Sequence, residues 1–148
     1  MNLSQALKQK NRLAGELVHQ QQILQRENAR RSDSVSNVDP KTVWSNILEI
    51  SEKLGELKGK ITKANVNIYS DLERMAELKA RIAFLQGLQK REGPEVTYVG
   101  RDQEKVEYTW KSFINQEESD KLVSELQTKI NDLQDTVDKY NATTQVEE

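Results

Sequence analysis

The stretch VWSNILEISEKLGELKGKITKA, residues 43–64, carries an apolar side chain at every third or fourth position. These positions are Val43, Ile47, Ile50, Leu54, Leu57, Ile61 and Ala64. A mean spacing of about 3.5 residues keeps such side chains on one side of a helix for about three heptads. The stretch therefore predicts a long helix that buries its apolar stripe against partner helices.

The composition of the 148-residue chain favours elongated helical packing. Hydrophobic residues make up 35%, charged residues 31% and aromatic residues only 5%. Long helices need only a narrow buried stripe, whereas a compact globule normally carries more apolar residues. We expect a mainly α fold in one domain, residues 1–148. Four long amphipathic helices would form an elongated helical-hairpin or coiled-coil bundle, with one small β-hairpin between the third and fourth helices.

Local signals place the helix ends. Asp39 followed by Pro40 is a helix start, because Asp39 can cap free amides and proline suits the first turn. Ser70 with Glu73, and Asn115 with Glu118, have the spacing of a capping box. Gly93-Pro94 closes the third helix. The expected helices are residues 3–28, 40–65, 71–91 and 116–140, with a polar loop at 29–39.

Between the last two helices the apolar period changes to two residues, on both sides of a turn at 100–104. This alternation predicts a β-hairpin over about residues 95–112. An isolated hairpin is marginal in water, so it either covers helix ends within one subunit or contacts another chain. Tyrosine and tryptophan are enriched at interfaces, which makes one hairpin face a candidate interaction surface. That face is expected to hold Val96, Tyr98, Val106, Tyr108 and Trp110.

A second face of the 43–64 helix carries Trp44, Gly55 and Gly59. A glycine inside a helix costs about 1 kcal/mol relative to alanine. One interpretation is a groove where another helix, from this chain or a second subunit, packs close to the backbone. The alternative is that glycine is simply tolerated on an exposed face.

No residue pattern indicates catalysis, a cofactor or a metal. The chain has no cysteine, and its one histidine, His19, lies on the polar side of the first helix. Net charge is −2, with both signs interspersed, so no general attraction to nucleic acid follows. The cluster Arg26, Arg30 and Arg31 is explained by the dipole at the end of the first helix. We therefore expect no enzyme, no small-molecule substrate and no nucleic-acid partner.

The location expected from the sequence is cytoplasmic, away from membranes. The first residues, MNLSQALK, enter an amphipathic pattern directly and form no apolar secretion core. No window approaches the run of roughly 18 apolar residues that a membrane-spanning helix needs.

Three short motifs in this order of elements resemble a small bacterial family labelled septicolysin-like. The family's initial helix, its turn after the second helix and its Asn-x-Thr-Thr ending match Met1, Leu3, Ala6, Leu7, Ile61, Asn65, Asn141, Thr143 and Thr144. The first asparagine of the family's turn is missing here, where Thr62 follows Ile61. The resemblance implies a helical bundle that self-associates, and it assigns no role to Asn65, Asn141, Thr143 or Thr144.

The function expected is that of a non-enzymatic cytoplasmic helical protein that forms a homo-oligomer through its long helices, its hairpin or both. Two alternatives stay open. The family label borrows the name of a haemolysin, which suggests a membrane-active or pore-forming protein. Carboxylates on facing helices suggest a metal-dependent protein.

Overall fold

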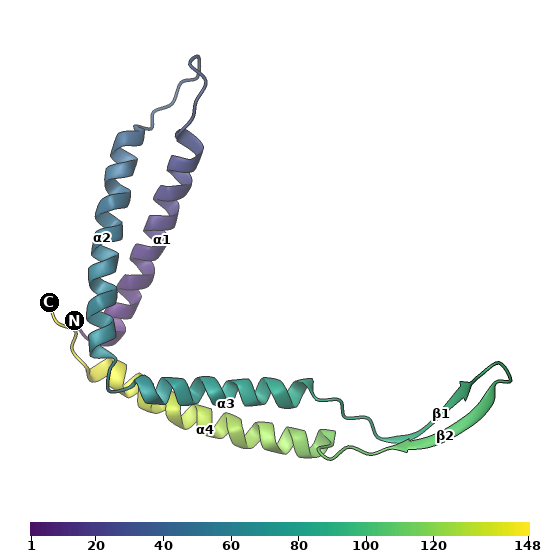
Figure 1. Cartoon of the computed structure of the whole chain (residues 1–148). Helices are drawn as coiled ribbons and strands as arrows, with labels where there is room; N and C mark the ends of the chain where they lie inside the picture. The colour runs from purple at the N-terminus through teal and green to yellow at the C-terminus, as the bar shows by residue number, and fades with distance from the viewer. The chain divides into compact units, whose positions relative to one another are not determined.

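The structure, a computed structural model, describes residues 1–148 and confirms the mainly helical fold (Figure 1). Its single two-stranded antiparallel sheet lies between the third and fourth helices, as predicted. The elements are α1 (Leu3–Glu27), α2 (Pro40–Ala64), α3 (Tyr69–Gly87), β1 (Gly93–Val99), β2 (Glu104–Trp110) and α4 (Gln116–Thr143).

The chain divides into two compact units where the composition predicts one domain. The first unit contains residues Met1–Tyr69 together with Val137–Glu148, and the second contains Ser70–Thr136. Helix α4 is continuous and contributes residues to both units.

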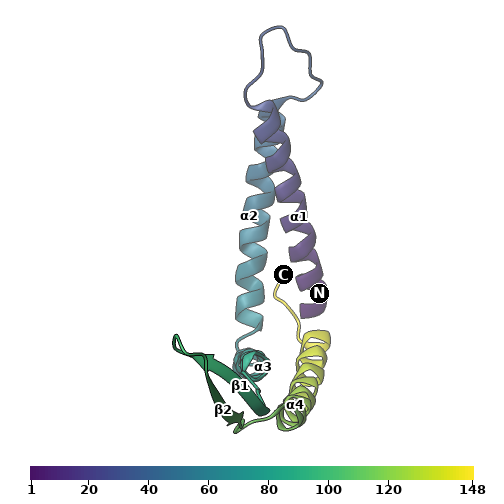
Figure 2. The ribbon, with the colours of Figure 1, turned by 90° about the vertical axis from the view of Figure 1, so that its right-hand side faces the viewer.

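In the first unit α1 and α2 form an antiparallel helical hairpin and lie side by side in both views (Figures 1 and 2). The predicted stripe of α2 faces α1 and is confirmed as a core element. Five of its side chains are buried, and Ile50 and Ala64 pack against the core cluster. The buried five are Val43, Ile47, Leu54, Leu57 and Ile61. Helix α1 contributes Leu3, Ala6 and Leu13.

Side-chain caps begin both helices of this unit. Asp39 accepts a hydrogen bond from the Lys41 amide at 3.1 Å, and Pro40 is the first helical residue, as predicted. The start of α1 has a capping box that the sequence analysis missed. There the Asn2 side chain accepts from the Gln5 amide at 2.9 Å, and the Gln5 side chain accepts from the Asn2 amide at 3.0 Å. These caps satisfy amides that a helix start leaves unpaired.

The C-terminal residues of the chain are held against the start of α1. The Leu3 amide donates to the Thr144 carbonyl at 2.8 Å, and the Val146 amide donates to the Met1 carbonyl at 3.0 Å. The Val146 side chain is only 4% exposed and belongs to the core cluster. The two chain ends therefore complete the first unit by burying one more apolar side chain.

Helix α3 differs from its predicted bounds at both ends. It starts at Tyr69, so Ser70 lies inside the helix instead of capping it. A tight turn that contains the buried Ile68 directly precedes the helix. Because of this turn, the helix begins two residues before its predicted start at residue 71. Helix α3 ends at Gly87 rather than near residue 91. Residues 89–92 are all polar, so longer helix would bury no further apolar surface.

In the second unit α3 and α4 face each other through long side chains. Met75 and Leu85 of α3, and Leu126 and Ile130 of α4, are buried. No Cα atom of α3 comes within 8 Å of a Cα atom of α4, in contrast to the close approach of α1 and α2. The predicted cap of α4 is present, because the Asn115 side chain accepts from the Glu118 amide at 2.8 Å.

Candidate functional site: the exposed hairpin

The hairpin β1–β2 runs beyond α3 and α4 instead of folding across them (Figure 1). No Cα atom of either strand lies within 8 Å of a helix Cα atom, and every residue of β2 is exposed. The hairpin therefore does not cover the helix ends within this chain. Of the two interpretations of the hairpin, the cover within one subunit is the one that the structure disfavours.

The register of the hairpin corrects the predicted face. Val99 pairs with Glu104, so the connecting loop has four residues, 100–103, and not the five of the predicted turn. Because side chains alternate along a strand, a shift of one residue moves every side chain of β2 to the opposite face. Val96 and Tyr98 consequently do not share a face with Val106, Tyr108 and Trp110.

We name the two faces after their largest aromatic residue. The Trp110 face consists of Gly93, Glu95, Thr97, Val99, Glu104, Val106, Tyr108 and Trp110. The Tyr98 face consists of Pro94, Val96, Tyr98, Lys105, Glu107 and Thr109.

On the Trp110 face the indole ring is held from several directions. The Arg91 guanidinium lies 4.9 Å from the centre of the Trp110 ring, within the range of a cation–π contact. The indole Nε1–H donates to the Glu95 carboxylate, which also lies 3.7 Å from Arg91. The Tyr108 ring meets the indole edge-on, with ring centres 5.8 Å apart and an interplanar angle of 72°. These contacts orient Tyr108 and Trp110 although both are more than a third exposed.

Hydrogen bonds between residues just outside the strands join the start of β1 to the end of β2, next to the helices. The Ser112 amide donates to the Glu92 carboxylate at 3.2 Å, and the Ser112 hydroxyl donates to the Arg91 carbonyl at 2.8 Å. At the other end, Gly100 and Gln103 have positive φ angles of 78° and 54°. Such angles close the tight loop and favour glycine, which makes Gln103 the less suited of the two.

A hollow of about 490 Å³ lies where the hairpin joins the helices of the second unit. It is bordered by aromatic residues from outside the strands that the sequence analysis missed: Phe113 is 95% exposed and Phe84 is 65% exposed. Phe113 directly follows the predicted hairpin, and Phe84 lies in α3. The sequence signal for them was the concentration of five of the eight aromatic residues within 84–113. Exposed apolar surface of this kind is typical of an interaction site.

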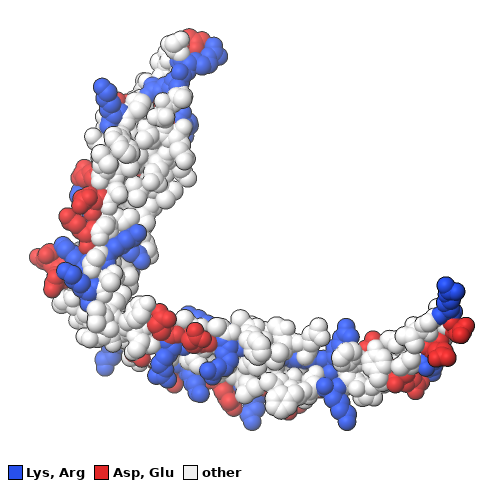
Figure 3. Space-filling model, in the orientation of Figure 1, with Lys and Arg blue, Asp and Glu red and all other residues white.

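The Tyr98 face combines apolar and charged side chains. Tyr98 is 61% exposed and Val96 is 44% exposed. Lys105 Nζ lies 2.9 Å from the Glu107 carboxylate two residues along the same strand. Charges of both signs gather at the outer end of the hairpin (Figure 3).

The two glycines among the predicted close-packing positions on α2 have open space beside them, and Trp44 lines a hollow with the α1 residues Gln21 and Leu24. A Cβ atom added to Gly55 or Gly59 would meet no atom within 4 Å, and Trp44 is 52% exposed. Tolerance of glycine on an exposed face explains both positions within one chain. Packing against a second subunit stays a prediction.

The positions that match the septicolysin-like motifs lie at helix ends. Asn65 is the C-cap of α2, and Thr143 in the last turn of α4 donates its hydroxyl to the Lys139 carbonyl at 2.9 Å. The Thr144 carbonyl accepts the Leu3 amide, and Asn141 lies in the final turn of α4. Three of these four residues thus have a local structural role.

The arginine cluster has local partners. Arg30 donates to the Glu27 carbonyl at 3.1 Å and to the Val38 carbonyl at 2.8 Å, and thereby spans the loop between α1 and α2. Arg31 pairs with Asp33 at 2.7 Å. His19 is exposed on α1.

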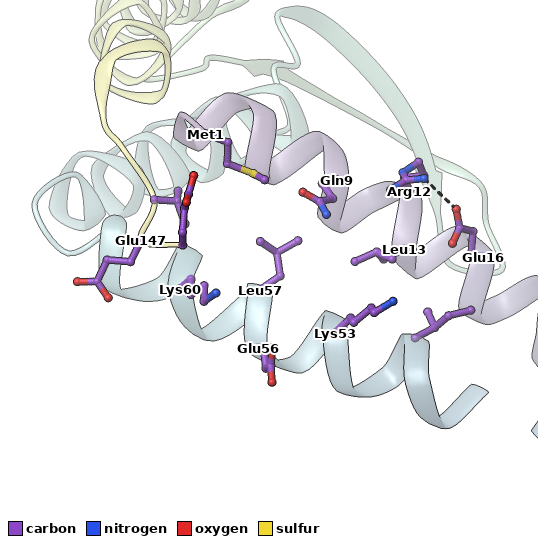
Figure 4. A pocket seen from close by; sticks show the side chains of 13 residues that line it. Met1, Gln9, Arg12, Leu13, Glu16, Lys53, Glu56, Leu57, Lys60 and Glu147 are labelled. Carbon is purple, nitrogen blue, oxygen red and sulfur yellow. Dashed lines mark hydrogen bonds and ion pairs between the residues drawn. The ribbon is translucent and has the colours of Figure 1, made fainter. Parts of the chain in front are cut away.

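A second hollow, of about 640 Å³, lies in the first unit between α1, α2 and the C-terminal residues (Figure 4). Its lining has both signs of charge, and two of its cations pair along their own helices. Arg12 lies 3.4 Å from Glu16, and Lys53 Nζ lies 2.6 Å from Glu49. Each of these two cations therefore already has a carboxylate partner on its own helix.

No group of three or more His, Cys, Asp or Glu side chains is placed to hold a metal ion. No helix combines the length and the apolar character that crossing a membrane requires.

Comparisons with known proteins identify no relative of this chain. No family model, no curated protein and no solved structure matches the chain.

Proposed function

We propose that this chain is a non-enzymatic cytoplasmic protein that self-associates, with the hairpin β1–β2 as its principal contact surface. The observation that carries the proposal is the exposure of the hairpin: β2 is exposed along its whole length, and no Cα atom of either strand lies within 8 Å of a helix Cα atom. A two-stranded hairpin gains independent stability from further strands or from packing on a helix. A second copy of the chain can supply both.

The Trp110 face supports a contact role. Tyr108 and Trp110 are oriented by Arg91 and Glu95 before any partner arrives. Oriented aromatic side chains lose less conformational entropy on binding, and tryptophan, tyrosine and arginine are the residues most enriched at binding hot spots.

The charge of β2 weighs against the membrane-active alternative. Glu104, Lys105 and Glu107 occupy three of its seven positions, and Arg101 and Asp102 lie in the adjoining loop. Charged side chains facing lipid are destabilising, by about 2–4 kcal/mol for a lysine or arginine at the bilayer midplane. Release of dye from liposomes at high protein-to-lipid ratio would support that alternative instead.

Solution mass tests the proposal. Sedimentation velocity or mass photometry at micromolar concentration should show an assembly larger than 17.1 kDa. Trp110→Ala should raise the dissociation constant by at least about tenfold, as expected for an interface hot spot.

Tyr69→Ala is the matched control, because Tyr69 is an exposed aromatic residue of the first unit that belongs to neither candidate contact surface. It should leave the mass distribution unchanged. A clean monomer for the unmodified chain would overturn the proposal, and an equal loss in both variants would move the contact surface away from the hairpin.

A further inference from the structure

The outer edge of β2 exposes backbone groups that have no partner in this chain. In an antiparallel pair, residues alternate between pairs that exchange N–H···O bonds and pairs that do not. Pro94 lies opposite Thr109 and has no N–H, so this pair is of the second kind. The alternation then turns the amides and carbonyls of Lys105, Glu107 and Thr109 away from β1, toward the open edge.

The outer edge of β1 is a poorer template. By the same alternation its outward residues are Pro94, Val96 and Tyr98, and Pro94 supplies no donor. Proline on an edge strand is a common protection against pairing with another chain. Of the two open edges, β2 is therefore the one prepared to accept a further strand.

If the β2 edges of two copies pair with each other, the charges of β2 favour one register of that pairing. An antiparallel pair of identical strands has a two-fold axis through one residue. An axis at Lys105 places Lys105 opposite itself, and an axis at Glu107 places Glu107 opposite itself. An axis at Tyr108 places Lys105 opposite Lys111. An axis at Thr109 places Glu107 opposite Lys111, but Lys111 lies outside β2 and only residues 108–110 of the two strands then overlap. The axis at Val106 is the only one that pairs unlike charges within β2, with Lys105 of each copy opposite Glu107 of the other.

We propose that two copies of this chain join edge to edge through β2, antiparallel and with the two-fold axis at Val106. The hairpins then form one four-stranded sheet in the order β1-β2-β2-β1. The outward amides and carbonyls of Lys105 and Glu107 complete hydrogen-bonded pairs between the copies, and Val106 faces Val106. The outer strands of this sheet are both β1, so Pro94 hinders the addition of a third copy and the assembly closes as a dimer.

This inference rests on the proposed self-association and specifies its geometry. The pairing also enlarges the Trp110 face, because the Val106 and Tyr108 side chains of the two copies become neighbours across the new strand boundary. The ion pair that Lys105 makes with Glu107 along its own strand is exposed, so it can give way to the pairs between copies.

Charge reversal gives a test in which two defective proteins restore each other. Lys105→Glu leaves only acidic side chains at both pairs, and Glu107→Lys leaves only basic ones. Each single variant should dimerise at least about tenfold more weakly, since like charges directly opposite are destabilising. An equimolar mixture of the two variants should form heterodimers, because every pair across the axis is then Glu with Lys.

Matched controls lie on α4. Lys121→Glu and Glu125→Lys make the same changes of charge at exposed positions in the same unit. Neither should alter the dimer, alone or mixed. Circular dichroism of each variant checks that the helical fold is kept. Recovery on mixing cannot come from repair within one chain, so it separates pairing between copies from a local effect on the hairpin.

Cysteine crosslinking locates the axis, and the chain has no native cysteine to interfere. The Cα atoms of a directly opposed pair without hydrogen bonds lie about 4.5 Å apart, which a disulfide can span. Val106→Cys should therefore crosslink readily under mild oxidation. Glu104→Cys lies on the same face but opposite Tyr108, and it should crosslink far less.

The possible outcomes distinguish failure of the β2 pairing from failure of the self-association on which it rests. A monomeric unmodified chain overturns both. A dimer that resists both charge reversals, or that crosslinks at position 104 and not at 106, overturns the β2 geometry and leaves self-association through another surface. Loss in the single variants with recovery in the mixture supports the geometry.

Discussion

The helical pair of the first unit and that of the second bury their apolar side chains at different backbone separations. Helix α1 contributes small residues to the contact, with Ala6 fully buried and Ala14 partly buried, so the backbones of α1 and α2 approach closely. Helices α3 and α4 meet through large side chains such as Met75, Leu85 and Ile130, and their Cα atoms stay more than 8 Å apart. In a densely packed contact, each deleted methylene group leaves a cavity that lowers the free energy of unfolding. Where helices lie further apart, long side chains can move into such a cavity and reduce this cost.

The same contrast extends to what surrounds each helical pair. The first unit gains Val146 and a set of backbone hydrogen bonds from the C-terminal residues, so its core is closed at one end. The second unit carries an exposed hairpin that contributes nothing to the core between α3 and α4. The difference teaches that the first unit places its apolar side chains in a core closed by the C-terminal residues, whereas the second leaves a whole strand and its aromatic side chains exposed.

The largest expected effect comes from emptying the core of the first unit. Leu3 is fully buried, and Leu3→Ala should lower the free energy of unfolding by about 2–5 kcal/mol. Leu85→Ala in α3 should fall near the low end of that range, at about 2 kcal/mol, because the wider gap lets neighbours move in. Urea unfolding followed by circular dichroism measures both.

Leu122→Ala serves as the control for these two variants, because Leu122 is 37% exposed and its loss should cost less than about 1 kcal/mol. Equal losses in the free energy of unfolding for Leu3→Ala and Leu85→Ala would show that the two helical pairs do not differ in their sensitivity to a deleted side chain.

A smaller loss of stability should follow from removing either of two hydroxyl groups of α4 that donate a hydrogen bond to a carbonyl near the end of α2 or α3. Tyr140 donates to the Ala64 carbonyl at the end of α2 over 2.6 Å, and Ser119 donates to the Leu85 carbonyl in α3 over 3.4 Å. Tyr140→Phe should cost about 1 kcal/mol, because a short hydrogen bond is lost and a partly buried carbonyl is left unpaired. Ser119→Ala should cost less, since a 3.4 Å contact is a weak hydrogen bond.

Hydrogen exchange of the amides around each link, together with urea unfolding, distinguishes the two hydroxyl variants. The reverse order of costs, with Ser119→Ala the more damaging, would show that the second unit depends on its polar contacts more than the distances indicate.

The smallest expected effect concerns an exposed ion pair on α2. A hydrogen bond from Lys53 and, next, the charge of Lys53 lower the pKa of Glu49 below its ordinary value of 4.5. A carboxyl whose pKa is lowered by folding contributes stability above its unfolded pKa and loses it as the pH falls through the folded value. Lys53→Met should return the pKa of Glu49 toward 4.5, as followed by NMR of the carboxyl group across an acid titration.

Because both side chains of this pair are exposed, the unfolding midpoint near neutral pH should hardly change in Lys53→Met. A substantial drop would mean that surface charge, and not the buried stripe, accounts for the stability of the first unit.

Local patterns predicted most of the helical architecture. The stripe from Val43 to Ala64, the Asp39-Pro40 start and the Asn115 cap act within a few residues, so their effect can be derived from neighbouring positions alone. The capping box at Asn2 and Gln5 has a local signal of the same kind, which the sequence analysis overlooked. The start of α3 could not be derived in this way, because the helix follows a turn in which Ile68 is buried, and burial depends on residues outside the local pattern.

The candidate site was predicted in part. Alternation located both strands and the residues that project from them, since the two-residue period is a property of each strand by itself. It could not show which side chains share a face, because that depends on the length of the loop between Val99 and Glu104. The cluster of Arg91, Glu95 and Trp110 likewise joins residues from different segments and has no periodic signature.

By itself the sequence determined four helices, their apolar stripes and a two-stranded hairpin, because periodicity and capping are short-range properties of the chain. Only the tertiary structure decided how Val146 closes the first unit, how far apart α3 and α4 lie, and which side chains share each face of the hairpin. The physical reason is that these features depend on side-chain volume and hydrogen-bond partners contributed by residues far away in the chain.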